Sequence, residues 1–290
     1  MTIRDALNEG AGLLAREETP FLDASVLLAH TLELSREKLL ASYPDTITAS
    51  CLETFRGLIR RRQSGVPVAY LTGEKEFFGR SFFVDRRVLI PRPDTEILVE
   101  AVLDLLSGNH GLPADRETSE PLRLLDVCTG TGCIPLTLAL ESEIPEIHAA
   151  DISPDAEQVF LINRERLGNP PVTFHRSDLL LDIPGRWHII TSNPPYLTTG
   201  EGQEMEGRNW AEPSLALLGG EDGLDLVRRL VLESKDTLER NGYLILEAAS
   251  VQMPAIADFM EKTGFREIKV FPDLAGRDRV IQGKLCGTQD

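Results

Sequence analysis

The chain opens with apolar residues at helical spacing. Within residues 1–65, apolar positions recur every three or four residues, as at Leu52, Phe55 and Ile59 ahead of Gly65. This spacing predicts a small helical bundle, which we expect to form a domain of its own. The residues themselves leave two roles open for it, structural support and the holding of a partner.

The pattern changes at residues 66–92, which we interpret as a link between domains. Two short apolar runs around Gly79-Arg80 predict a β-hairpin with its turn at those two residues. Residues 90–96 (Ile-Pro-Arg-Pro-Asp-Thr-Glu) then lead through two prolines into a helix, and we expect Asp94 to cap it.

From residue 122 onwards, apolar strands alternate with helices. We therefore expect residues 93–290 to form a third section of the chain, a domain that follows the helical bundle and the link. We expect strands at 122–127, 147–152, 172–175, 188–191 and 243–246 and near 268 and 280, and helices at 133–140, 155–167 and 224–238 and after 246. Residues 108–121 and 200–222 are expected to be loops, the second long and irregular, as loops over active sites often are. Repeated βα units predict an α/β fold with a doubly wound, mostly parallel sheet covered by helices on both faces.

The strand at 188–191 runs into Asn193-Pro194-Pro195-Tyr196. The two prolines end the strand and hold Asn193 extended at its carboxyl end. The Asn193 amide and the Pro194 carbonyl then offer two acceptors for the hydrogens of a planar NH2 group, and Tyr196 offers a flat ring. The alternative is an ordinary proline-rich turn after a strand.

In doubly wound sheets, ligands bind at the carboxyl ends of the strands, so the first strand-to-helix turn is a candidate cofactor site. Its glycines allow a tight turn and a close approach of a ligand to the backbone. The candidate binding residues there are Cys128, Thr129, Gly130, Thr131 and Gly132. Asp151, at the end of the second strand, is placed to accept both hydroxyls of a ribose.

A nucleoside cofactor fits this turn better than a dinucleotide does. Pro135 stands where the third glycine of a dinucleotide-binding fingerprint is expected, which disfavours an NAD-dependent oxidoreductase. S-adenosylmethionine has no phosphates and so needs no loop to bind a pyrophosphate. Asp178, after the third strand, is expected to accept a hydrogen bond from the adenine amino group of this cofactor. Each aspartate alone is an ordinary strand-end or capping carboxylate; their combination with the glycine turn and Asn193 is what points to a site.

A methyl donor beside a pocket for a planar NH2 group predicts methyl transfer to nitrogen. Acceptors that hold both hydrogens aim the nitrogen lone pair at the methyl group and favour the charge that develops. Two alternatives remain: a DNA or RNA adenine N6-methyltransferase with a flipped base in the same pocket, and a non-catalytic adaptor that only binds the cofactor. The intact tetrapeptide at Asn193 counts against the adaptor.

The charge and the cysteines of the chain restrict the partners and the cellular compartment that we expect. A net charge of −16 argues against a broad phosphate-binding surface, so no direct nucleic-acid partner is expected. The four cysteines form no C-x-x-C pair and predict reduced thiols in a cytoplasmic protein, with no metal site. No signal peptide or membrane span is indicated, and the fold needs no more than a monomer.

The sequence resembles, almost from end to end, the protein-(glutamine-N5) methyltransferases of peptide chain release factors, called HemK or PrmC. The resemblance is carried by residues 73–79 (Gly-Glu-Lys-Glu-Phe-Phe-Gly), 90–96, 126–132, 193–196, Glu212-Pro213 with Ala216-Leu217, and 273–279 (Asp-Leu-Ala-Gly-Arg-Asp-Arg). The first two stretches are the most particular to the family, whereas the Asn-Pro-Pro-Tyr box is shared with adenine and cytosine amino methyltransferases.

The resemblance implies a seven-stranded, Rossmann-like, S-adenosylmethionine-dependent methyltransferase domain after a substrate-recognition bundle and a hairpin link. It implies methylation of the glutamine in the Gly-Gly-Gln motif of release factors, with Asn193, Pro194, Pro195 and Tyr196 at the glutamine amide. The cofactor would then contact residues 128–132, Asp151, Asp178, Leu179 and Asn193. Two departures from the family pattern are Cys128, where many members have glycine, and Ala248-Ala249 after Glu247.

Overall fold

The structure, a computed structural model, describes residues 1–108, 121–207 and 210–286. It divides into two compact units: the first comprises Met1–Glu74 together with Trp210 and Ala211, and the second comprises the other described residues from Lys75 onwards. Among the described residues, no helix combines the length and the apolar character needed to cross a membrane.

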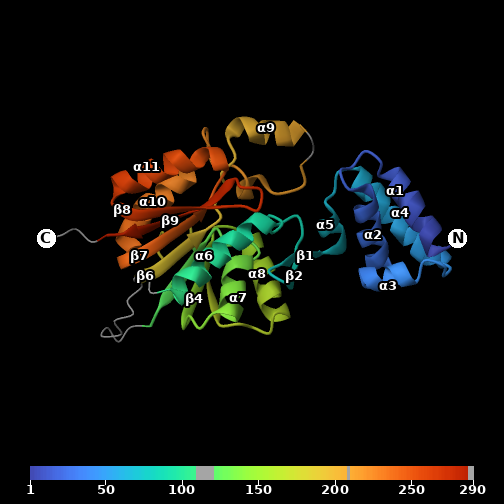
Figure 1. The fold of residues 1–290 in the computed structure, drawn as a ribbon, viewed down its shortest axis with the longest axis horizontal. Coiled ribbons are helices and arrows are strands. Elements are labelled where there is room, and N and C mark those ends of the chain that lie inside the picture. The colour runs from blue at the N-terminus through green and yellow to red at the C-terminus, as the bar shows by residue number, and fades with distance from the viewer. Residues whose placement is uncertain (109–120, 208–209, 287–290) are drawn as a thin grey trace. The chain divides into compact units, whose positions relative to one another are not determined.

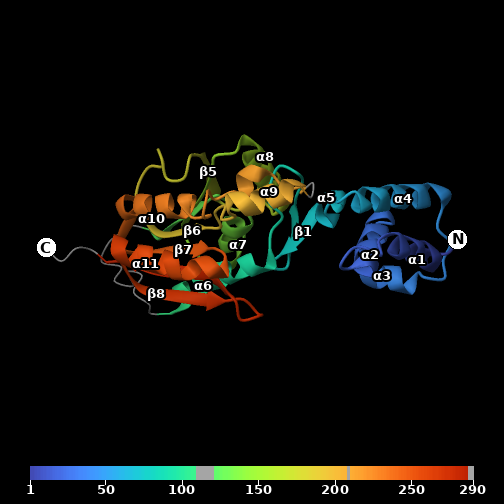
Figure 2. The ribbon, with the colours of Figure 1, turned by 90° about the horizontal axis from the view of Figure 1, so that it is seen from above.

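The secondary structure of residues 1–73 is helical, as the apolar spacing predicted for residues 1–65. The helices are α1 (Ile3–Leu13), α2 (Pro20–Thr31), α3 (Arg36–Ala41), α4 (Ala49–Gln63) and α5 (Val68–Thr72), and Figure 2 shows α1, α2 and α4 packed together. Their core contains the fully buried Leu27, Leu28 and Phe55. A side chain at Gly10 would meet the Phe55 ring at 2.5 Å, so glycine lets α1 and α4 approach closely. Helix α5 lies in the segment where we expected only a link and a hairpin.

The hairpin consists of β1 (Glu74–Phe77) and β2 (Arg80–Phe83). Its turn is Phe78-Gly79, one residue earlier than the sequence predicted, and both residues have positive φ, 50° and 71°. Two positive φ values suit the right-handed twist of a two-residue hairpin. The backbone N–H of Phe78 donates to the carboxylate of Glu96 at 2.8 Å, which helps to hold this unusual conformation.

The second unit is built on a seven-stranded sheet in the order β5-β4-β3-β6-β7-β9-β8. Its strands are β3 (Arg123–Val127), β4 (Glu146–Asp151), β5 (Val172–Arg176), β6 (Trp187–Ser192), β7 (Leu238–Glu247), β8 (Phe265–Pro272) and β9 (Asp278–Leu285). Strands β3 to β7 run parallel to one another, and β9 is antiparallel to both β7 and β8. The expected mostly parallel, doubly wound sheet is confirmed.

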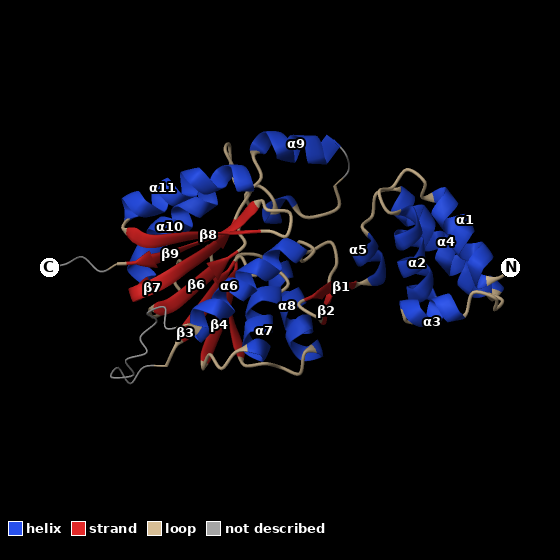
Figure 3. Cartoon of the chain, viewed as in Figure 1, coloured by secondary structure: helices blue, strands red, loops and turns tan. Residues whose placement is uncertain are grey.

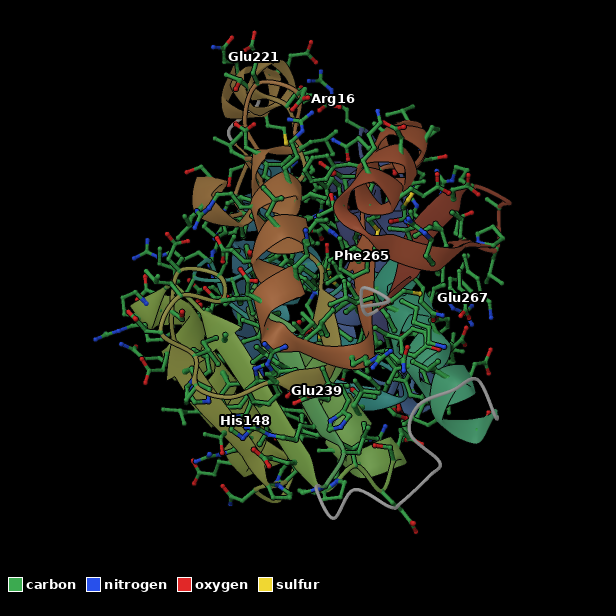
Figure 4. The ribbon with its side chains drawn as sticks, turned by 90° about the vertical axis from the view of Figure 1, so that its left-hand side faces the viewer. Arg16, His148, Glu221, Glu239, Phe265 and Glu267 are labelled. Carbon is green, nitrogen blue, oxygen red and sulfur yellow. The ribbon has the colours of Figure 1, made fainter. Side chains whose placement is uncertain are left out.

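Helices cover both faces of the sheet, as Figures 1 and 3 show. One face carries α6 (Glu96–Ser107), α7 (Cys133–Glu141) and α8 (Pro154–Arg166), and the other carries α10 (Asp225–Thr237) and α11 (Met253–Thr263). Neighbouring strand residues point to opposite faces: Ile189 packs in the core under the first set of helices and Ile190 in the core under the second. Figure 4 shows the molecule from the left-hand side of Figure 1 and labels His148 of β4 and Phe265 of β8.

Three expectations about loops and caps need correction or fall outside the structure. Residues 200–222 are not a continuous irregular loop, because α9 (Thr199–Gly207) and a short 3-10 turn, η2 (Ser214–Ala216), lie within them. Asp94 does not cap α6: it lies in the 3-10 turn η1 (Pro93–Thr95) and pairs with Arg279 at 3.0 Å. Of the predicted loop at 108–121, the part from 109 to 120 lies outside the described residues.

Candidate functional site

The two sequence motifs meet where the strand order of the sheet reverses. β3 and β6 are parallel neighbours, with Val127 opposite Ser192. The Ser192 hydroxyl donates to the Val127 carbonyl at 2.6 Å and joins the two strand ends. Cys128 and Asn193 therefore leave adjacent strands on the same edge, at the switch point where doubly wound folds bind ligands.

The glycine turn after β3 is held in an unusual backbone conformation. Cys128, Gly130 and Gly132 all have positive φ, at 59°, 53° and 79°, a region that favours glycine. A Cβ at Gly132 would meet the Phe160 ring at 2.5 Å, whereas a Cβ at Gly130 would meet nothing within 4 Å. Gly132 is thus needed for packing on α8, and Gly130 leaves open space over the turn.

Asp151 ties this turn to the end of β4. One carboxylate oxygen accepts from the Gly130 N–H at 2.9 Å, and the other accepts from the Ser153 N–H at 2.9 Å. Burial raises the pKa of Asp151, and these N–H donors oppose the rise. Each carboxylate oxygen keeps a further lone pair for a ligand, so the predicted ribose contact remains open to the same side chain.

The residues expected to contact the adenine lie in slightly different positions from those that the sequence predicted. β5 ends at Arg176, so Asp178 lies two residues beyond the strand, and its carboxylate pairs with Arg229 at 3.2 Å. Leu179 is buried and has a positive φ of 52°. Ile152, to which the sequence reasoning assigned no role, follows Asp151 and is 50% exposed.

Asn193 has one end of its side-chain amide paired and the other unpaired. Its Nδ2 donates to the Thr95 hydroxyl at 3.2 Å. Its Oδ1 is buried and has no hydrogen-bond partner among the described residues. A buried acceptor without a donor is costly, and a donor on a bound ligand would satisfy it.

Tyr196 is held at both its ring and its backbone. The phenol donates to Glu247 Oε1 at 3.4 Å, and the Tyr196 carbonyl accepts from Gln252 Nε2 at 2.9 Å. Burial is the main cause that raises the pKa of Tyr196. A Cβ at Gly223 would meet the Tyr196 carbonyl oxygen at 2.2 Å, so this part of the tetrapeptide packs closely on the neighbouring loop.

Two buried carboxyl groups, Asp126 of β3 and Glu247 of β7, belong to the strands next to these motifs. Burial raises the pKa of both Asp126 and Glu247 to about 7. Thr191 donates to Asp126 Oδ1 at 2.8 Å, and Asp126 and Glu247 both act electrostatically on Cys133 of α7. Sequence reasoning did not assign a role to Thr95 or Glu247, although a glutamate that ends a buried strand, as Glu247 ends β7, is an uncommon residue to find there.

An ion pair fixes the segment before α6 against the loop after the tetrapeptide. Arg92 pairs with Glu212 at 2.6 Å, and the other carboxylate oxygen of Glu212 accepts from the Ile90 N–H at 2.9 Å. The Glu212 side chain is only 2% exposed. The segment that carries Thr95 is therefore anchored both here and at the Asp94–Arg279 pair.

The structure thus joins residues 128–132 and Asp151 into one group through the Gly130 N–H. Beside it, Asn193 is hydrogen-bonded to Thr95, and Tyr196 is hydrogen-bonded to Glu247. Pro194 and Pro195 are buried beside them. Within residues 1–108, 121–207 and 210–286, no group of three or more His, Cys, Asp or Glu side chains could hold a metal ion.

This fold, with a glycine turn and an Asn-Pro-Pro-Tyr box at the switch point, is that of a Rossmann-like methyltransferase. A solved structure of a methyltransferase from Pyrococcus furiosus shares the fold: it matches 79% of this chain and 99% of its own, with a TM-score of 0.51 and 16% sequence identity.

Comparison of the sequences gives the family. Residues 5–73 match the model of the PrmC N-terminal domain. The release factor glutamine methyltransferase of Clostridium acetobutylicum is 36% identical over 97% of this chain and 98% of its own length. The release factor glutamine methyltransferase of Koribacter versatilis is 39% identical over 98% of this chain and 99% of its own length. The chain belongs to the family of release factor glutamine methyltransferases.

Proposed function

We propose that this protein transfers a methyl group from S-adenosylmethionine to the side-chain amide nitrogen, N5, of the glutamine in the Gly-Gly-Gln motif of peptide chain release factors. The observation that carries the proposal is the buried, unpartnered Oδ1 of Asn193 at the switch point. The names and full-length similarity of the relatives support the choice of substrate.

The residues of the glycine turn fit the cofactor. The space above Gly130 suits the amino acid end of S-adenosylmethionine, and the remaining lone pairs of Asp151 suit the ribose hydroxyls. Ile152, Leu179 and Asp178 suit the adenine, with Asp178 sharing its carboxylate between Arg229 and the adenine amino group. When bound, the cofactor supplies an electrophilic methyl group on a sulfonium.

The tetrapeptide holds and orients the substrate amide. Asn193 Oδ1 accepts one hydrogen of the glutamine NH2, and the Pro194 carbonyl accepts the other. The nitrogen lone pair then points out of the amide plane, and the two acceptors stabilise the positive charge that develops on nitrogen. The Tyr196 ring packs against the amide, while Pro195 keeps the backbone rigid. Positioning of this kind can lower the activation free energy by as much as roughly 7–11 kcal/mol.

The helical unit is assigned to the recognition of the protein substrate. We keep the division into a recognition bundle (1–65), a link (66–92) and a catalytic domain (93–290), since a tripeptide in the pocket leaves most of a release factor to be recognised elsewhere. We expect a monomer that acts in the cytoplasm, where translation termination takes place. No membrane or direct nucleic-acid partner is needed.

The competing substrate is an adenine flipped out of DNA or RNA, which the same acceptors would suit. The net charge of −16 and the named relatives favour the glutamine. To separate the two, methyl-labelled S-adenosylmethionine is incubated with the protein, a release factor and a DNA duplex in one tube. We expect label in the release factor alone; label only in the duplex would overturn the proposed substrate.

A further inference from the structure

Gln252 connects three segments of the chain beside the Asn-Pro-Pro-Tyr tetrapeptide. It lies in the 3-10 turn η3 (Ser250–Gln252) and is 8% exposed. Its Nε2 donates to the carbonyl of Tyr196 at 2.9 Å and to that of Asp222 at 3.3 Å, and its Oε1 accepts from the Ala249 N–H at 3.1 Å. One side chain thus holds the tetrapeptide, the loop before α10 and the start of η3 together.

Asn163 makes the same arrangement beside the glycine turn. It lies on α8 and is fully buried. Its Nδ2 donates to the carbonyls of Phe83 at 3.1 Å and Thr131 at 3.0 Å, and its Oδ1 accepts from the Phe83 N–H at 2.6 Å. Phe83 ends β2 of the hairpin, and Thr131 belongs to the glycine turn. A second buried amide thus holds the hairpin, α8 and the glycine turn together.

Hydrogen-bonding chemistry fixes which way each of these two amides points. A backbone N–H only donates and a carbonyl only accepts, so the side-chain oxygen must face the N–H and the NH2 must face the carbonyls. Both hydrogens of each NH2 are used within the protein, which leaves no donor for a ligand. Gln252 and Asn163 therefore act on the site through the backbone that they hold.

The tetrapeptide is held at both of its ends. Just before it, the Ser192 hydroxyl donates to the last carbonyl of β3, and at its end Gln252 holds the Tyr196 carbonyl. The second proline of the tetrapeptide has its φ fixed by its ring. The carbonyl of Pro194, which we assign as an acceptor for the substrate NH2, lies between the two fixed points. Its position therefore depends on both of them.

The loop before α10 lies directly against the tetrapeptide. A Cβ at Gly223 would meet Gln252 Nε2 at 2.5 Å, and a Cβ at Gly219 would meet the Pro195 carbonyl oxygen at 2.6 Å. Glycine at both positions allows this close approach of two backbones. The Gly219 N–H also donates to the Leu197 carbonyl at 2.8 Å. The loop is a close-fitting support, and Gln252 connects it to the tetrapeptide by hydrogen bonds.

We propose that Gln252 and Asn163 are positioning residues that hold separate halves of the site. Gln252 sets the acceptors for the substrate NH2 and so acts on methyl transfer, whereas Asn163 sets the glycine turn and so acts on cofactor binding. This inference rests on the proposed function, because it assumes that the tetrapeptide meets an NH2 group and that the turn meets S-adenosylmethionine. A merely structural role predicts instead that loss of either amide affects both functions alike.

The test replaces each amide by the acid of the same size, in Gln252→Glu and Asn163→Asp. An ionised carboxyl group donates no hydrogen bond and a protonated one donates only one, where the amide donates two. For Gln252→Glu we expect kcat for methylation of a whole release factor, with both substrates saturating, to fall at least about tenfold. The Kd of S-adenosylmethionine, measured by calorimetry, should stay within about twofold of the wild type.

Asn163→Asp should show the opposite division. We expect the Kd of S-adenosylmethionine to rise at least about tenfold, since the glycine turn loses its connection to α8 and the hairpin. With saturating cofactor, kcat should fall less than in Gln252→Glu, because the tetrapeptide keeps its own support.

Gln158→Glu is the control for the added charge. Gln158 is exposed on α8, and its side-chain oxygen accepts from Arg87 at 2.9 Å, a hydrogen bond that glutamate keeps. Its kcat and Kd should both match the wild type. Far-ultraviolet circular dichroism and the stoichiometry of cofactor binding give the folded fraction of each variant, by which kcat is corrected. If an acidic variant does not fold, Gln252→Met and Asn163→Leu remove the same hydrogen bonds without a charge and should show the same division.

A wild-type kcat in Gln252→Glu, a wild-type Kd in Asn163→Asp, or equal losses of both quantities in both variants would overturn the positioning roles. A wild-type protein that binds S-adenosylmethionine and methylates no release factor would instead overturn the proposed function, so the two failures are distinguishable.

Discussion

The backbone N–H of Gly130 donates to the Asp151 carboxylate at 2.9 Å, across 21 residues of sequence. The glycine turn after β3 and the acidic end of β4 are therefore one unit, in which the proposed ribose-binding carboxylate also shapes the turn. Loss of that carboxylate should affect the cofactor twice, through the ribose and through the turn.

Replacement of Asp151 by alanine should weaken cofactor binding. It removes the acceptor for the Gly130 and Ser153 N–H groups and for the ribose, and hydrogen bonds to charged groups contribute about 1.5–3 kcal/mol each. We expect S-adenosylmethionine affinity, measured by calorimetry, to fall about 10- to 100-fold. Asp155→Ala, at an exposed carboxylate in the first turn of α8, is the matched control. Unchanged affinity in Asp151→Ala would contradict the ribose role.

The two glycines of the turn should respond differently to alanine. Gly132→Ala forces a methyl group against Phe160 in a left-handed conformation and should destabilise the fold by about 2–5 kcal/mol in urea unfolding. Gly130→Ala meets no protein atom, so it should cost only about 1–2 kcal/mol of stability. Its methyl group occupies the space assigned to the cofactor, and calorimetry should show reduced affinity. Equal stability of the two variants would argue against the packing role of Gly132.

The sequence was sufficient to predict features that depend on residues close together along the chain. A β-branched run ended by two prolines placed Asn193 at a strand end, and β6 does end at Ser192. The strand before Asp151 and the turn at residues 128–132 were found in the same way. Each of these depends on the local backbone preference of a few consecutive residues, which sequence patterns report directly.

Stability should fall as pH rises toward 8, partly because of Glu247. Its folded-state pKa of about 7 lies above the ordinary value of 4.5. The unfolded chain therefore releases this proton at lower pH than the folded protein does, and between pH 4.5 and 7 rising pH favours unfolding. Glu247→Gln removes this cost, which is about 3 kcal/mol at full ionisation.

Urea unfolding at pH 5 and pH 8 measures this difference. We expect Glu247→Gln to gain stability relative to the wild type at pH 8 but not at pH 5. Asp126, with the same direction of shift, should keep part of the pH dependence in that variant. An equal effect of the substitution at both pH values would show that Glu247 is not titrating in this range.

Asn193→Ala should abolish methyl transfer and spare cofactor binding. It removes the acceptor at Oδ1, and loss of one polar group that stabilises a transition state typically costs about 100- to 1,000-fold in rate. Transfer of labelled methyl to a release factor measures the rate, and calorimetry measures cofactor affinity. Asn193→Asp is the matched variant, since it keeps the size and an acceptor but cannot donate to Thr95 as the amide does. Substantial transfer by Asn193→Ala would remove Asn193 from the catalytic site.

The remaining features depend on contacts between distant parts of the chain. Thr95 and Asn193 are 98 residues apart, and Glu247 is 51 residues beyond Tyr196, so no local pattern joins them. Asp94 was expected to cap a helix because Asp is a common cap, but its ion pair with Arg279 directs the side chain elsewhere. The turn at Phe78 was misplaced by one residue because the contact with Glu96 supports a positive φ that is rare for phenylalanine.

Tandem mass spectrometry of a release factor, after incubation with this protein and methyl-labelled S-adenosylmethionine, tests the central claim most directly. A parallel sample uses a factor whose Gly-Gly-Gln glutamine is replaced by alanine. We predict one added methyl group on the side chain of that glutamine in the intact factor and none in the substituted one. An unmodified glutamine in the intact factor, or equal labelling of both factors, would contradict the account.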